Sequence, residues 1–316
     1  MQKFELLSLL VFLIIVFLVY NLEIKFIISR IRHRDVKSVL LKKPIIIIIH
    51  FLAVIGMLCF LYGYFIEPYW IQVNTVNIFT KKLKNTPLKI VQISDLHCDR
   101  KIRNENKLVD IIGYINPDIV VFTGDALNTI EALPTFKETM KKLKAKIGKF
   151  AVRGNFDVWY WHDIDLFNDT GFKLLDADSI RLEKEGEVFY ISGLSTQFSE
   201  KCRKILKDIP NDSYSIFLYH YSDLIEDLKN INVDLYLAGH VHGGQVALPF
   251  YGALITLSRY GKKYERGRHI VGNKVLYVNR GIGMEGGIAP KVRFWSRPEI
   301  TVFNIIPEGA KSPDCF

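Results

Sequence analysis

The sequence has few cysteines, and their positions do not suit a disulfide framework or a zinc–thiolate site. Its 316 residues include only four, Cys59, Cys98, Cys202 and Cys315, and these show no paired spacing. A small disulfide-rich domain is therefore excluded. Internal repeats and low-complexity linkers are also missing, and 49% of the residues are hydrophobic. A disordered chain would be poor in such residues, so we expect a folded protein with incidental thiols.

Most of the chain also lacks an excess of charge of either sign. The formal net charge is +9, but residues 1–85 contain 11 basic and 4 acidic residues, a net of +7. Residues 86–316 therefore contain 31 basic and 29 acidic residues, a net of only +2. A protein that binds nucleic acid concentrates basic residues in its folded part, so we expect no nucleic-acid partner. Basic groups beside apolar runs are instead typical of membrane proteins.

Two long apolar runs lie in the first quarter of the chain. Residues 6–20 are interrupted only by Ser8, and residues 45–66 contain no formal charge. Because a bilayer span needs about 20 apolar residues, the second run predicts a transmembrane helix. The first predicts either another span or a signal peptide, although no small-residue cleavage site follows it. We expect residues 1–85 to form a membrane anchor and residues 86–316 a separate domain.

The segment that connects the two runs is rich in basic residues. They are Lys25, Arg30, Arg32, Arg34, Lys37, Lys42 and Lys43. The positive-inside rule places this connecting loop in the cytoplasm. If both runs span the bilayer, the rest of the chain faces outward, and if only one spans, the rest of the chain could face inward. The sequence therefore predicts attachment to the cell (inner) membrane, with the lipid bilayer as a partner, and leaves the side open.

Short β-rich runs follow residue 86, and most of them end in a polar cluster. We predict strands at 88–93, 119–122, 150–152, 188–191, 216–219, 235–238, 275–278 and 300–303. Helical periodicity appears at 108–115, 133–146 and 224–228. This alternation indicates an α/β layered fold, in which polar residues at the carboxyl ends of strands form the functional site.

Carboxylate, carboxamide and imidazole groups follow these strands. The set is Asp95, His97, Asp125, Asn155, His220, His240 and His242. Oxygen and nitrogen ligands without sulfur suit Mn, Fe, Zn or Mg. Seven ligands exceed the need of one ion, so we expect two divalent ions that share a carboxylate. Two ions about 3.5–4 Å apart can clamp a phosphoryl group and activate water. Residues i and i+2 of an extended segment face the same way. Asp95 and His97 can therefore point to one centre, and so can His240 and His242.

The order and spacing of these groups resemble the calcineurin-like metallophosphoesterase superfamily over roughly residues 86–306. The motifs D-x-H, G-D, G-N-H-[DE], H and G-H-x-H stand here as Asp95-Leu96-His97, Gly124-Asp125, Gly154-Asn155-Phe156-Asp157, His220 and Gly239-His240-Val241-His242. The resemblance implies a four-layer α/β/β/α sandwich with a binuclear centre, manganese being the first metal to expect. It implies that Asp95, His97 and His242 hold one ion, that Asn155, His220 and His240 hold the other, and that Asp125 bridges them.

The sequence departs from the family motif at Phe156, where the family has a histidine that assists the leaving group or stabilises the developing charge. The acidic residue beside it, here Asp157, orients that histidine in the family. A phosphate that leaves from a pyrophosphate is already a stable anion, so a missing proton donor suits pyrophosphate cleavage better than alkyl-ester cleavage. The further candidates for catalysis are Asp125, Asn155, Asp157 and Arg153, with His162 nearby. The aromatic run 159–161 is typical of one of two arrangements. It either packs in the core or forms an amphipathic rim, which would lie near the membrane or near a base of the substrate.

The Gly243-Gly244-Gln245 extension and the tail around Asn279-Arg280-Gly281 resemble a membrane-attached branch of the superfamily. That branch includes the chlamydial-type UDP-2,3-diacylglucosamine hydrolase of lipid A biosynthesis. The resemblance implies an enzyme that hydrolyses UDP-2,3-diacylglucosamine to UMP and acylated glucosamine 1-phosphate. One alternative is an outward-facing envelope phosphodiesterase or phosphatase, and another is a non-catalytic metal-binding membrane protein. Both enzymatic hypotheses imply a nucleotide-linked or lipid-linked phosphate substrate.

Overall fold

The structure is a computed structural model that describes residues 3–32, 43–286 and 290–309. Most of the predicted basic loop between the apolar runs, and Cys315, lie outside the described residues.

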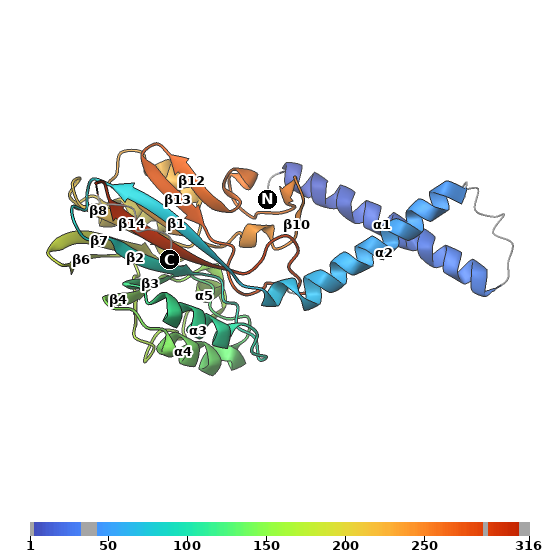
Figure 1. The fold of residues 1–316 in the computed structure, drawn as a ribbon, viewed down its shortest axis with the longest axis horizontal. Coiled ribbons are helices and arrows are strands. Elements are labelled where there is room, and N and C mark those ends of the chain that lie inside the picture. The colour runs from blue at the N-terminus through green and yellow to red at the C-terminus, as the bar shows by residue number, and fades with distance from the viewer. Residues whose placement is uncertain (1–2, 33–42, 287–289, 310–316) are drawn as a thin grey trace.

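Two long helices precede the sheets, α1 (Lys3–Ile31) and α2 (Lys43–Phe65). Each is long and apolar enough to cross a membrane. They pack against each other, with the hydroxyl of Tyr20 donating to the carbonyl of Ala53 at 3.0 Å, and project together from one end of the globular part (Figure 1). The start of α1 and the end of α2 both lie at that end. Length and composition thus support the predicted anchor.

Two six-stranded mixed sheets and a two-stranded hairpin form the globular part among the described residues. The first sheet has the order β1 (Gln72–Thr80), β14 (Glu299–Pro307), β2 (Leu88–Ile93), β3 (Ile119–Phe122), β4 (Gly148–Ala151), β5 (Phe172–Leu174). The second has the order β12 (Gly267–Val271), β13 (Lys274–Val278), β9 (Leu235–Ala238), β8 (Tyr214–Tyr219), β7 (Glu187–Leu194), β6 (Asp178–Lys184). The hairpin is β10 (Ala247–Leu248) and β11 (Gly252–Ala253), and the shorter helices are α3 (Glu105–Ile115), α4 (Leu133–Lys142), α5 (Asn155–Tyr160) and α6 (Cys202–Leu206).

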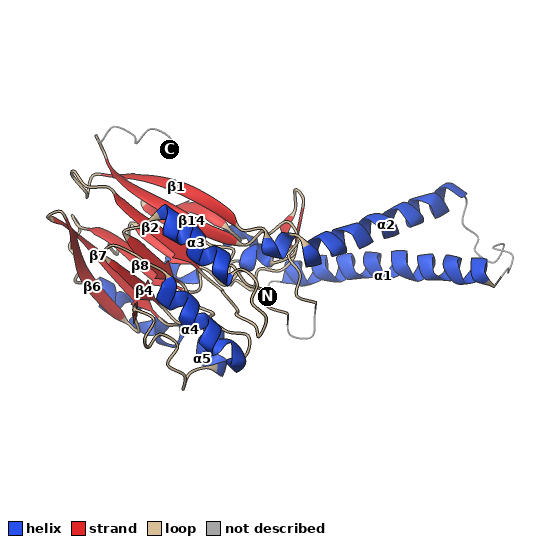
Figure 2. Ribbon diagram, turned by 60° about the horizontal axis from the view of Figure 1, so that its bottom comes forward, coloured by secondary structure: helices blue, strands red, loops and turns tan. Residues whose placement is uncertain are grey.

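Strand alternation divides the apolar side chains among three cores. In β3, Ile119 and Val121 pack between the two sheets, whereas Val120 and Phe122 pack beneath α3 and α4. Strand β8 alternates in the same way, and its outward residues pack with α6. This is the period of two that a pleated strand imposes. The layers are therefore helix, sheet, sheet and helix, which confirms the predicted fold class (Figure 2).

All eight predicted strands are present, and three of them, β2, β3 and β9, have the predicted bounds. Two predicted helices differ from the structure. The helix predicted at 133–146 ends at Lys142, and the segment predicted at 224–228 is a 3₁₀ turn, Asp223–Asp227. The apolar residues of that turn cover little more than one turn of helix, too little to support an α-helix.

The first edge strand, β1, was not predicted and lies in the segment that we assigned to the anchor. It pairs with β14 in parallel, from Gln72 opposite Glu299 to Thr80 opposite Pro307. As an edge strand it has many exposed or half-buried side chains, so its sequence carries only a weak apolar pattern. We therefore propose that the globular part begins at Gln72 and not at residue 86.

The strand directions place the polar clusters beside the long helices. Strand β1 follows α2 and is parallel to β14, which is antiparallel to β2. Strand β2 therefore ends at the side of the sheet where β1 begins, and β3 and β4 are parallel to β2. The carboxyl ends of β2, β3 and β4 consequently lie at the end of the sandwich from which α1 and α2 project (Figure 1).

Candidate metal centre

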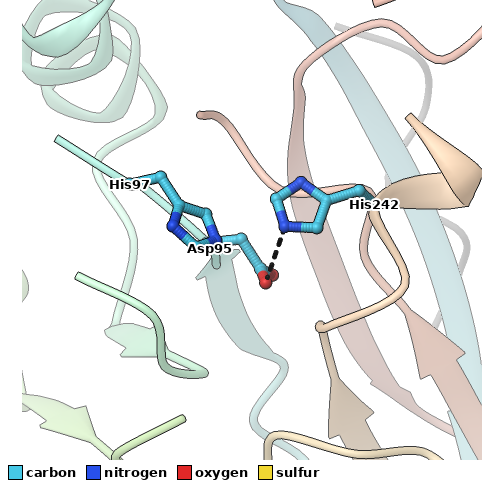
Figure 3. A group of neighbouring side chains, drawn as sticks. All are labelled: Asp95, His97 and His242. Carbon is cyan, nitrogen blue, oxygen red and sulfur yellow. Dashed lines mark ion pairs between the residues drawn. The ribbon is translucent and has the colours of Figure 1, made fainter. Parts of the chain in front are cut away.

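The seven predicted ligand residues follow five strands from the two sheets, and all of them except Asn155 form two groups. In one group, the ligand atoms of Asp95, His97 and His242 all lie within 4.8 Å of one another, and in the other the same holds for Asp125, His220 and His240. Figure 3 shows the first group, in which His242 faces the carboxylate of Asp95. Their Nε2 and Oδ1 atoms are 3.3 Å apart. Residues from both sheets thus meet where the two sheets end.

One carboxylate oxygen lies between the two groups. Oδ2 of Asp125 is 3.6 Å from Nε2 of His97 and 3.2 Å from Nε2 of His220. The other oxygen, Oδ1, accepts a hydrogen bond from the backbone N–H of Phe156 at 2.8 Å. The backbone bond therefore turns Oδ2 toward both groups. This geometry supports the expectation that Asp125 is the bridging residue.

Several buried ligand atoms lack a hydrogen bond among the described residues. They are Nε2 of His97, His220 and His242, and Oδ1 of Asn155. Buried polar atoms are nearly always hydrogen-bonded, so the three unpaired Nε2 atoms within the two groups require an explanation. Nitrogen and oxygen lone pairs that face two carboxylates are the surroundings that a divalent cation needs. The residues present therefore fit two cations.

Burial and mutual charge set the protonation of the site. Burial lowers the pKa of His97 to about 4 and that of His240 to about 3, because the imidazolium form loses its hydration. Burial also acts to lower the pKa of His220, but Asp125 and Asp95 outweigh it and raise the value to about 9. Burial acts to raise the pKa of both carboxyls, yet the imidazoles hold each below its usual range. Both carboxylates are thus charged near neutral pH, as metal ligands must be.

Outer hydrogen bonds orient the imidazoles. Nδ1 of His220 lies 2.7 Å from the carbonyl oxygen of Thr123, so it donates there and turns Nε2 toward Asp125. Nδ1 of His97 lies 3.0 Å from Oδ1 of Asn128, whose amide nitrogen donates to the carbonyl of Met284. Asn128 was missed by the sequence analysis. Its only signal was its position three residues after Asp125.

A buried arginine lies behind the first group and was also missed. Arg293 is fully buried, and its Nη2 is 3.3 Å from Nδ1 of His242. Its guanidinium also donates to the carbonyls of Gly283 and Ser296. Nothing in the sequence around residue 293 marks this contact, because the contact depends on how the loop before β14 folds over the site.

The backbone at the ligands is left-handed and not extended. Five ligand residues have positive φ: Asp95 49°, His97 39°, Asp125 61°, His240 69° and His242 52°. This region is costly for residues other than glycine and is typical of functional sites. The prediction from extended geometry that residues 240 and 242 meet at one centre is wrong. His242 joins the first group and His240 the second, which is the division that the family resemblance implied.

Three residues that we considered for catalysis do not join the two groups. The carboxylate of Asp157 accepts hydrogen bonds from the backbone N–H groups of Asp125, Ala126 and Gly154 at 2.8, 2.8 and 2.9 Å. The Asp157 carboxylate therefore supports the loop that carries Asp125, and burial raises the pKa of Asp157 to about 6.

The side chain of Arg153 is occupied elsewhere. Its guanidinium donates to the carbonyls of His162 and Ile164, each at 3.0 Å. His162 is exposed, and its Nε2 lies 2.9 Å from Oδ2 of Asp163. Hydrogen bonds to its own neighbouring loop thus orient the Arg153 side chain, and its catalytic role stays a prediction.

Phe156 lies beside the first group. Its ring is perpendicular to the ring of His97, with 4.8 Å between centroids. Of the aromatic residues that follow, Trp159 and Tyr160 are exposed, whereas the indole N–H of Trp161 donates to the carbonyl of Leu127 at 3.1 Å. The run thus divides between two exposed side chains and one that packs against the core, and a rim near the membrane or a substrate base stays a prediction.

Comparison with known proteins identifies what the chain resembles. The calcineurin-like phosphoesterase family profile matches residues 88–244. The chain is 32% identical over 272 residues to the uncharacterized metallophosphoesterase YkuE of Bacillus subtilis, covering 77% of this chain and 89% of that protein. It is 26% identical over 284 residues to the UDP-2,3-diacylglucosamine pyrophosphatase LpxG of Chlamydia muridarum, covering 70% of this chain and 84% of that protein. The solved structure of TT1561 of Thermus thermophilus matches with a TM-score of 0.41 and 12% identity, over 62% of this chain and 91% of that one.

Proposed function

Because the chain belongs to the calcineurin-like metallophosphoesterase family, we propose that it hydrolyses the pyrophosphate bond of UDP-2,3-diacylglucosamine to UMP and acylated glucosamine 1-phosphate. The observation that carries this choice is the phenylalanine at position 156, whose ring lies against His97. A phenyl ring cannot donate a proton. A phosphate leaving group needs none at neutral pH, whereas an alkoxide does.

The chain's own residues prepare the site for this reaction. Asp95, His97 and His242 are proposed to hold one cation, Asn155, His220 and His240 the other, and Asp125 both. Two divalent cations bound there would stabilise charge on the phosphoryl group and make water a stronger nucleophile. The ionised carboxylates and the hydrogen bonds behind His97 and His220 hold the ligand atoms in place before substrate arrives. Manganese is the proposed metal, with iron, zinc or magnesium as alternatives.

The position of the site supports a lipid-linked substrate. The strand ends that carry the ligands lie at the end of the sandwich that α1 and α2 leave (Figure 1). If these helices are embedded in a bilayer, the two groups lie on the membrane side of the globular part. A diacylated sugar would then present its phosphates without being extracted from the lipid.

Charge favours a second candidate, an outward-facing phosphodiesterase or phosphatase of the cell envelope. Both helix ends that meet the globular part lie on one side. The opposite ends, the last turns of α1 with Arg30 and the start of α2 with Lys43, lie on the other side and carry basic residues. The positive-inside rule would then place the globular part outside, whereas nucleotide-linked substrates are made inside. A reporter fused after Phe316 distinguishes the two candidates by the side on which it is active.

Product analysis with the full chain in detergent tests the leading proposal. With added Mn²⁺, we expect mass spectrometry to detect UMP and the acylated sugar phosphate. Asp125→Ala should abolish their formation, and Tyr114→Ser, on the exposed face of α3, should not. Hydrolysis of a generic phosphodiester without hydrolysis of the UDP-lipid would favour the second candidate. Undiminished hydrolysis by Asp125→Ala would contradict the shared-carboxylate site.

A further inference from the structure

The loops that flank the first metal group also contact the start of α1. The hydroxyl of Thr256 donates to Glu5 at 2.6 Å, and the hydroxyl of Tyr251 donates to Ser8 at 2.6 Å. Both donors lie in the β10–β11 region, which follows His242 closely in the chain. The first turns of α1 are therefore attached to a segment that begins at the metal centre.

The end of α2 is attached to the other side of the same group. The backbone N–H of Arg293 donates to the carbonyl of Gly63 at 2.9 Å. The buried carboxylate of Glu67 accepts hydrogen bonds from the backbone N–H groups of Trp295 and Ser296. Because Arg293 also contacts His242, the loop between residues 293 and 296 joins α2 to the metal centre.

Large apolar side chains project from these attachment points. Trp70, Phe250, Leu257 and Trp295 have exposed fractions of 53%, 110%, 53% and 54%. We call these four residues the collar. The guanidinium of Arg297 lies 4.0 Å from the centre of the Trp70 ring. Isolated exposed apolar residues are ordinary, but the collar residues lie where the globular part meets the helices. Phe250 and Leu257 adjoin Tyr251 and Thr256, which bind α1. Trp295 donates its backbone N–H to Glu67, and Trp70 lies three residues after Glu67 in the segment that follows α2.

We propose that the collar is a membrane-interface surface, which enters the headgroup region of the bilayer and holds the metal centre at the level of lipid phosphates. This inference rests on the proposed membrane anchor. Its occupant is a lipid surface, because the collar continues directly from two apolar helices that are long enough to span one. Tryptophan side chains favour this depth, since the ring is apolar and its N–H remains hydrated. Arg297 beside Trp70 would meet the phosphates.

The collar also narrows the substrate class of the proposed reaction. A phosphate bond attached to a membrane-embedded lipid lies at the depth at which the collar would hold the centre. A water-soluble ester gains nothing from that position. The surface thus favours lipid-linked phosphates over soluble ones by raising their local concentration at the site.

Tryptophan fluorescence provides a test that does not depend on catalysis. The chain has four tryptophans, Trp70 and Trp295 in the collar and Trp159 and Trp161 in or beside α5. The Trp159→Phe/Trp161→Phe variant keeps only the collar indoles, and the Trp70→Phe/Trp295→Phe variant keeps only the other pair. With the full chain in nanodiscs of brominated phosphatidylcholine, we expect strong quenching of the first variant and weak quenching of the second. Equal quenching, or the reverse order, would overturn the proposal.

Kinetics supply the second test. Trp70→Ser/Phe250→Ser should lower the ratio of kcat/KM for UDP-2,3-diacylglucosamine in nanodiscs to that for bis(p-nitrophenyl) phosphate by roughly tenfold. Tyr114→Ser, which removes an exposed aromatic far from the collar, should leave the ratio unchanged. A ratio that does not fall in the collar variant overturns the inference. If the collar indoles are quenched but the UDP-lipid is not hydrolysed, the proposed substrate fails and the collar stands.

Discussion

The ring of Phe156 lies perpendicular to the ring of His97, with 4.8 Å between their centroids. An apolar ring therefore lies beside the first metal group at the place where the family motif has a histidine. The backbone of the same residue still serves the site, because its N–H donates to Oδ1 of Asp125 at 2.8 Å. The substitution thus removes a proton donor and keeps the contact that orients the proposed bridging carboxylate.

Restoring the histidine should broaden the reaction. We expect Phe156→His to raise kcat for an alkyl phosphodiester by roughly tenfold or more, because general-acid catalysis is worth about 10²–10⁴ where a leaving group needs a proton. Hydrolysis of a pyrophosphate should change by less than about threefold, since its leaving phosphate needs none. Steady-state kinetics on both substrates measure the difference. Phe156→Leu is the control, and an equal gain on both substrates would contradict the leaving-group argument.

Replacing the buried carboxylate of Asp157 should loosen the loop that carries Asp125. In Asp157→Asn, one carboxylate oxygen becomes an amide nitrogen that faces backbone N–H donors and cannot accept their hydrogen bonds. We expect the free energy of unfolding to fall by about 1–3 kcal/mol, the usual effect of leaving buried donors unpaired. Thermal unfolding measures this change. Metal affinity should fall too, and a stable variant with full metal affinity would show that the three hydrogen bonds contribute little.

The backbone of Gly154 lies against Asp125, the proposed bridging residue. A Cβ at this position would overlap the carboxylate of Asp125 and lie 2.7 Å from its backbone nitrogen. Gly154→Ala should therefore displace Asp125 and abolish hydrolysis, with a lower melting temperature. Gly113→Ala is the matched control, since nothing lies within 4 Å of a Cβ there. As a helix position in α3, it should gain about 0.5–1 kcal/mol. Activity retained in Gly154→Ala would contradict the close packing.

Metal binding should release a proton from His220. The pKa of about 9 without a cation means that this imidazole is protonated at neutral pH and must lose its proton to become a ligand. Apparent affinity for Mn²⁺ should therefore rise by about tenfold per pH unit between pH 7 and 9 and level off above pH 9. Titration calorimetry in buffers of different ionisation enthalpy counts the protons. Affinity that is independent of pH over this range would show that His220 is already neutral.

The strands and ligands of the site were predictable because both are local patterns. A strand buried on both faces is a continuous apolar run, so Leu88–Ile93 and Ile119–Phe122 were found with their bounds, and the polar residues after them followed by position. Strand β1 was not predicted because many side chains of this edge strand face solvent, so the sequence has no continuous apolar run there. Asn128 and Arg293 were missed because a hydrogen bond to a ligand leaves no periodic signal.

The sequence by itself determined which side chains this protein offers for chemistry: the candidate oxygen and nitrogen ligands, their order after the strands, the apolar helices and the phenylalanine at the motif position. Only the tertiary structure decided how these parts combine. Left-handed backbone at His240 and His242 places the two side chains in different groups, whereas the i, i+2 rule for extended segments predicts a single group. The tertiary structure also joined Gly63 and Glu67, at the end of α2, to the loop behind His242. Such contacts arise from packing between segments more than 200 residues apart, and local propensity carries no information about them.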